Sequence, residues 1–157
     1  MIELLIVIVI LAISAAIVVP MASSAGGMQL RAAVNMVAAD LEYAKSMSIS
    51  RGQRYSVMFD ADAETYQIVD EDGNTISHPV KKGFPYAVNF QSDSRLGRVD
   101  IESVDFGGTS TVGFDYLGSP YDGSGAPLNS GIVTLRANGV TRTVNVEPVT
   151  GFISISD

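Results

Sequence analysis

The sequence predicts an α+β protein in which a long N-terminal α-helix packs on an antiparallel β-sandwich. Three observations support this class. The first 22 residues are almost entirely apolar, apolar side chains recur every three or four positions between residues 30 and 44, and apolar residues alternate with polar ones from Gln53 onward. The chain has 157 residues, which is enough for an anchor and one domain with its own core.

Composition excludes several classes of function. The net charge is −7, which argues against a phosphate-binding surface, so no nucleic-acid partner is expected. The chain contains no cysteine, and this excludes disulfides, thiol chemistry and cysteine metal sites. Fifteen glycines and six prolines favour a body with many turns, as all-β domains have.

The first half of the predicted helix, residues 1–22, has the length and composition of a transmembrane segment. Between Leu4 and Val19 the only polar side chain is that of Ser14. Glu3 stands at the head of this run, where a carboxylate is costly in a membrane. We therefore expect Glu3 to have a function and a partner.

Residues 20–27 are predicted to be the point where this helix bends. Pro20 removes one backbone donor and clashes with the preceding turn, which predicts a kink at residues 16–20. Gly26 and Gly27 each lower helix stability by about 1 kcal/mol relative to alanine. The pair is therefore a predicted hinge.

Residues 23–52 are predicted to continue the helix as an amphipathic segment. The apolar stripe has spacings of 4, 3, 4 and 3 and consists of Leu30, Val34, Val37, Leu41 and Ala44. We place the polar residues of this segment on the other faces of the helix: Arg31, Asn35, Asp40, Glu42 and Lys45. Gly52 is the predicted C-terminal cap. The first half should thus project from a domain on which the second half lies.

Residues 53–157 are predicted to form the β-domain, with about seven or eight short strands and one sheet against the helix. The expected strands cover residues 55–59, 66–70, 75–77, 99–106, 112–116, 132–137, 140–146 and 152–156. Asn138-Gly139 is a strong signal for a tight turn between two of them. Residues 80–89 are irregular, and residues 117–131 are expected to be a loop because of their glycines and prolines.

No group of residues predicts catalysis or a cofactor. His78 is the only histidine, so a zinc site is excluded, and we interpret it as an ordinary surface residue. The acidic runs 60–62 and 70–74 resemble parts of calcium loops but lack a closing glutamate, and turn formation explains them without metal. Tyr116, Tyr121 and Asp122 could line a binding surface. The sequence therefore predicts no enzyme, metal or cofactor.

The N-terminus resembles the class III signal segment of type IV pilins and type II secretion pseudopilins. The resemblance lies in Met1 to Ile8 and in Pro20, which stands 17 residues after Glu3 where the family has its kinking proline. Residues 39–53 and the ending 148–155 resemble the H-type minor pseudopilins (GspH/FimT-like). The leader that a prepilin peptidase cleaves, and the methylated phenylalanine that would begin the mature chain, do not precede Met1.

The resemblance implies a minor pseudopilin, a structural subunit of the periplasmic pseudopilus of a type II secretion system. The subunit would be a single-pass protein of the bacterial inner membrane, with its C-terminal domain in the periplasm. In the filament, the spans would pack side by side, and Glu3 would meet the N-terminal amine of a neighbouring subunit. The implied partners are other pilins or pseudopilins, the prepilin peptidase and the inner membrane.

Two alternatives remain open at this point. A minor type IV pilin would serve adhesion or DNA uptake, although the acidic charge disfavours DNA. A secreted β-sandwich binding module would instead have an ordinary signal peptide cut near Ser23-Ser24-Ala25. Against a signal peptide, no basic residue precedes the apolar run, and Glu3 stands where lysine or arginine is expected.

Overall fold

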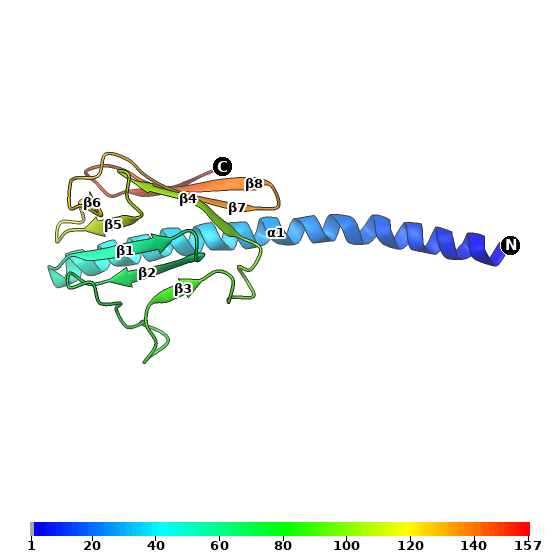
Figure 1. Ribbon diagram of the computed structural model, residues 1–157, viewed down its shortest axis with the longest axis horizontal. Coiled ribbons are helices and arrows are strands. Elements are labelled where there is room, and N and C mark those ends of the chain that lie inside the picture. The colour runs from blue at the N-terminus through cyan, green and yellow to red at the C-terminus, as the bar shows by residue number, and fades with distance from the viewer. Residues whose placement is uncertain (1) are drawn as a thin grey trace.

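The computed structural model describes residues 2–157, and the side chains of all of these except residues 15–25. One helix, α1, runs without interruption from Ile2 to Arg51. Its N-terminal half projects from a β-domain that packs along its C-terminal half (Figure 1). This confirms the helix and the antiparallel sheets of the predicted fold class, and the 50 residues of α1 end within one residue of the predicted helix.

The C-terminal end of α1 is built as the sequence predicts. Gly52 has a φ of 64° and donates its N–H to the carbonyl of Ser48, with an N···O distance of 2.9 Å. Such a left-handed residue after the last turn suits glycine, which has no Cβ to clash. The buried Ser48 hydroxyl accepts the Tyr55 N–H at 3.2 Å, so it fixes the step from α1 to the first strand.

Nine strands form two antiparallel sheets. The five-stranded sheet has the order β3-β2-β1-β5-β6, and its strands are β1 Tyr55–Asp60, β2 Thr65–Val69, β3 Ala87–Asn89, β5 Thr111–Phe114 and β6 Pro120–Asp122. The four-stranded sheet has the order β4-β7-β8-β9, and its strands are β4 Asp100–Phe106, β7 Gly131–Ala137, β8 Val140–Val146 and β9 Ile153–Ser156.

The Asn138-Gly139 turn joins β7 and β8 as predicted. Asn138 has a φ of 51° and Gly139 a φ of 76°, and Ala137 pairs with Val140 across the turn. Positive φ at both central residues is the requirement of a type I′ turn, whose twist matches that of the strands. The hairpin tip lies beside α1 where the helix leaves the domain (Figure 1).

Four expectations about the β-domain were wrong. Residues 80–89 are not irregular throughout, because β3 lies at their end and pairs with β2. Residues 117–131 are not a plain loop, because β6 lies within them and pairs with β5. Residues 126–128 cover the outer edge of β6. The Leu128 N–H donates to the Pro120 carbonyl, and the Asp122 N–H donates to the Ala126 carbonyl. The segment 75–77 forms only isolated bridges rather than a strand. One sheet was expected against the helix, but both sheets contact α1. The five-stranded sheet does so through β1 and β5, and the four-stranded sheet through β7, β8 and β9.

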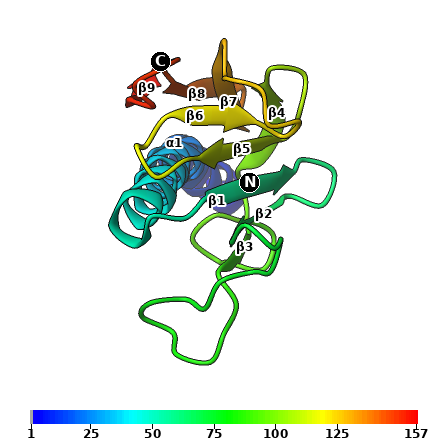
Figure 2. The ribbon, with the colours of Figure 1, turned by 90° about the vertical axis from the view of Figure 1, so that its left-hand side faces the viewer.

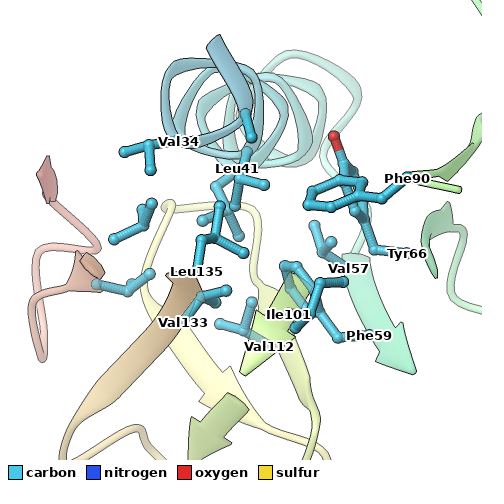
Figure 3. Packing of buried hydrophobic residues seen from close by; sticks show 14 of the residues in the cluster. Val34, Leu41, Val57, Phe59, Tyr66, Phe90, Ile101, Val112, Val133 and Leu135 are labelled. Atoms are coloured by element: carbon cyan, nitrogen blue, oxygen red, sulfur yellow. The ribbon is translucent and has the colours of Figure 1, made fainter. Parts of the chain in front are cut away.

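The core lies between α1 and the two sheets. The predicted stripe from Leu30 to Ala44 is at most 1% exposed. Figure 3 shows Val34 and Leu41 of α1 facing Leu135 of β7, while Val57 of β1 comes in from the other sheet. Viewed along the helix axis, the sheets lie beside α1 (Figure 2). Burial of this apolar surface is the main term that holds the helix on the domain.

Candidate assembly surface

The N-terminal half of α1 carries the largest exposed apolar surface that the structure describes. Ten large apolar side chains between Ile2 and Ile13 are exposed, from 47% at Val9 to 78% at Ile2. They surround the helix on all sides, so no single face is set aside for the β-domain. Contiguous exposed apolar surface of this kind marks a site of contact with protein or lipid.

Two polar side chains interrupt this surface in different ways. Ser14 donates its hydroxyl to the carbonyl of Ile10 at 2.8 Å, so its hydrogen-bonding need is met within the helix. Glu3 lies exposed in the first turn. The positive end of the helix dipole favours a carboxylate there, but leaves it available for a cationic partner.

The predicted hinge residues lie in an unbroken helix. The side chain of Pro20 is outside the described part, and the kink there stays a prediction. Gly26 is buried against the β7–β8 hairpin, because a Cβ at Gly26 would lie 2.2 Å from Nδ2 of Asn138. Gly27 has open space around it. Gly26 therefore permits a close approach of the hairpin tip, and bending at either glycine remains a prediction.

Where the structure describes side chains, no helix is long and apolar enough to cross a membrane.

A second cluster joins α1 to the five-stranded sheet through the carboxylate of Asp40. Asp40 is 8% exposed, and its two oxygens accept the hydroxyl hydrogens of Tyr66 at 2.5 Å and Tyr86 at 2.8 Å. Burial raises the pKa of Asp40, although the two tyrosine hydrogen bonds act in the opposite direction. Burial also raises the pKa of Tyr66, and the adjacent Asp40 carboxylate adds to that rise.

The assignment of Asp40 to an outer face of the helix was therefore wrong. Asp40 follows Val37 by three positions and precedes Ala44 by four, which places it on the edge of the buried stripe. Its burial is tolerated because two hydroxyl groups replace the lost water. The spacing places Asp40 next to the buried stripe, whereas its burial depends on Tyr66 and Tyr86.

His78 has a structural role that its surface position did not predict. Its ring stacks on that of Tyr86, with centroids 4.6 Å apart, and Tyr43 stacks on Tyr86 at 5.5 Å. The His78 Nδ1 atom accepts the backbone N–H groups of Val80 and Lys81, each at 3.1 Å. The histidine is thus part of the support for residues 76–86.

The acidic runs and the tyrosines of the long loop serve local structure. Asp70 Oδ1 accepts the N–H groups of Asp72 and Asn74, and Asp122 Oδ1 accepts those of Ser124 and Ala126. Tyr121 contacts Asp115 and the Arg54 guanidinium, whereas Tyr116 is 60% exposed. These contacts explain the acids as turn formers.

The comparisons with known proteins concern mainly the β-domain. The family model of the type II transport protein GspH matches residues 33–150. No curated protein matches the chain.

Solved structures of similar fold come from two kinds of assembly. The minor pseudopilin EpsH from the type 2 secretion system of Vibrio cholerae matches with a TM-score of 0.58 and 10% identity, over 82% of this chain and 96% of that one. The type IV minor pilin FimU of Pseudomonas aeruginosa matches with a TM-score of 0.53 and 17% identity, over 82% of this chain and 88% of that one. At these identities, the likeness extends to the fold alone.

Proposed function

Because this chain belongs to the GspH family of type II transport proteins, we propose that it joins a periplasmic pseudopilus through the N-terminal half of α1. It is a minor pseudopilin, a structural subunit and not an enzyme. The observation that carries the proposal is the set of ten exposed apolar side chains between Ile2 and Ile13 on a helix that projects from the domain. Water is a poor environment for such a surface, since each buried large apolar side chain is favourable by about 1.5–3 kcal/mol.

Two environments satisfy this surface in turn. Before assembly, residues 1–22 would span the inner membrane, residues 23–52 would continue the helix as its amphipathic part, and residues 53–157 would form the periplasmic domain. After assembly, the same apolar side chains would contact the helices of neighbouring pseudopilins. A prepilin peptidase would process and methylate the precursor before this step.

Glu3 is the proposed contact that sets the register between subunits. In a low-dielectric helix bundle, its carboxylate requires a cationic partner, for which the N-terminal amine of a neighbouring subunit is the proposed group. Pro20 and the Gly26-Gly27 pair are the proposed positions at which α1 adapts on leaving the membrane.

The test compares Glu3→Ala with Glu42→Ala, each expressed with a prepilin leader in cells that lack the native chain. Both positions are exposed acids on α1, but Glu42 lies beside the β-domain. We expect both variants to reach the membrane, and the amount of Glu3→Ala in sheared filaments to fall at least tenfold. Equal incorporation of both variants would contradict the role of Glu3.

The likeness to FimU favours one second candidate, a minor pilin of a type IV pilus. Deletion of the chain separates the two functions. Loss of protein secretion with normal pili supports the secretion system, whereas loss of pili with normal secretion supports the alternative.

A further inference from the structure

Residues 76–86 form a short two-armed projection, which we call the finger. Its arms run antiparallel: Tyr86 donates its N–H to the Ile76 carbonyl at 2.7 Å, His78 donates to the Phe84 carbonyl at 2.9 Å, and Ser77 bridges to Pro85. Figure 2 shows the finger as the green loop that extends below β3, away from α1 and both sheets.

The base of the finger is fixed to the rest of the molecule. Ile76 donates its N–H to the Ile68 carbonyl, and Ile68 donates its N–H to the Tyr86 carbonyl. Both arms are therefore hydrogen-bonded to β2. The Tyr86 hydroxyl is bound to Asp40 of α1, and its ring lies between those of His78 and Tyr43. The position of the finger is therefore set by the core of the domain.

The tip is ordered by its own hydrogen bonds. Phe84 donates its N–H to the Lys81 carbonyl at 3.1 Å, and Gly83, the third residue of this turn, has a φ of 86°. A type II turn requires such a φ, which glycine adopts without strain. His78 Nδ1 holds the N–H groups on the other arm. A partner would therefore meet a preorganised tip, which lowers the entropy cost of binding.

The tip exposes apolar and cationic side chains together. Val80 is 83% exposed and Phe84 65% exposed, and Lys81 and Lys82 lie between them. No ion pair formed by described residues includes either lysine, although Lys81 lines a hollow together with Asp93. An exposed aromatic side chain suits an apolar pocket of a partner, and adjacent cations at the rim of such a contact select a partner of opposite charge.

We propose that the finger tip is a docking site for another protein, one whose surface combines an apolar hollow for Phe84 and Val80 with carboxylates for Lys81 and Lys82. The partner's charge follows from complementarity, because two adjacent lysines stand at the tip of a chain whose net charge is −7. The finger goes beyond the proposed assembly through α1, since it uses none of the residues between Ile2 and Ile13.

The finger and the apolar half of α1 extend in different directions. In both Figure 1 and Figure 2 the finger extends sideways from the axis of α1, whereas the apolar half of the helix extends along that axis. The finger and the apolar half of α1 therefore present two separate surfaces. A protein alongside the β-domain fits this direction.

The experiment places a photoreactive benzoyl-phenylalanine at Phe84 in the full-length chain, in living cells that contain the secretion machine. We expect one discrete protein adduct, reduced at least tenfold by the double change Lys81→Glu and Lys82→Glu. The same probe at Val149, which is 80% exposed and lies outside the finger, is the matched control and should not give this adduct.

Four outcomes would overturn the proposal: no adduct, an adduct unchanged by the charge reversal, the same adduct from position 149, or an adduct with lipid or with a second copy of the chain. The incorporation of each variant into sheared filaments is measured in parallel. If the finger variants enter filaments normally but give no charge-dependent adduct, the docking proposal for the finger is rejected and the proposed assembly through α1 is not. If the Glu42→Ala control fails to enter filaments, the assembly assay itself is at fault. Unchanged thermal unfolding confirms that the exposed substitutions leave the fold intact.

Discussion

The two halves of α1 are one continuous helix in two different environments. From Gly26 to Arg51 one stripe is buried and the remaining faces are largely polar, whereas from Ile2 to Ile13 apolar side chains surround the helix and are exposed. The large apolar side chains of residues 2–13 are not covered by the β-domain, whereas the buried stripe of the second half packs against both sheets. This contrast supports the proposal that α1 joins an interface for folding to an interface for assembly.

The largest effect should come from shortening a core side chain in the second half. Leu41 is fully buried, and Leu41→Ala should lower the free energy of unfolding of the β-domain by about 3 kcal/mol because it removes apolar contacts and leaves a cavity. Leu11→Ala is the matched change in the first half, where Leu11 is 64% exposed. Denaturant unfolding of the full chain in detergent should place Leu11→Ala within about 0.5 kcal/mol of the parent. Equal losses would end the distinction between the halves.

The next effect concerns the carboxylate of Asp40. Asp40→Ala leaves the buried hydroxyls of Tyr66 and Tyr86 without their acceptor, so we expect a loss of about 2 kcal/mol in the free energy of unfolding. Glu42→Ala, two positions along on the exposed surface, is the control and should leave stability nearly unchanged. A stability of Asp40→Ala equal to that of the parent would contradict the role of Asp40 as acceptor.

The pH dependence of stability provides a further test of Asp40. Since burial raises the folded-state pKa of Asp40, the folded chain holds a proton that the unfolded chain has lost at pH values between the usual and the raised pKa. The contribution of Asp40 to stability therefore falls as pH rises through this window. Urea midpoints measured from pH 4 upward should show this fall in the parent and lack it in Asp40→Asn. An identical pH profile for the two proteins would count against a raised pKa.

The smallest effect should separate the two glycines. Gly27→Ala should raise the free energy of unfolding by about 0.5–1 kcal/mol, because the added Cβ meets open space and alanine favours the helix. Gly26→Ala should give less, because the Asn138 side chain must move. Thermal unfolding of the two variants measures the difference. A greater stability for Gly26→Ala than for Gly27→Ala would argue against the hairpin contact.

Local patterns predicted the elements whose causes are local. The alternation of Tyr55, Val57 and Phe59 predicted β1, and Asn138-Gly139 predicted the turn between β7 and β8 because only a few residues favour positive φ. The resemblance of the N-terminus and the ending pointed to the family to which the chain belongs. Strand β6 was missed because a three-residue strand rich in turn formers has no periodic signal.

The long helix, its apolar first half, the buried stripe from Leu30 to Ala44 and most of the strands follow from local sequence patterns, because periodicity and turn chemistry act over a few residues. The burial of Asp40, the contact of Gly26 with a hairpin tip and the support that His78 gives to the finger arise from the folded arrangement. Each of these depends on residues more distant in the chain or on a turn geometry that has no characteristic spacing. Asp40 meets Tyr66 and Tyr86 across 26 and 46 positions, and such a contact exists only after the sheets have packed on the helix.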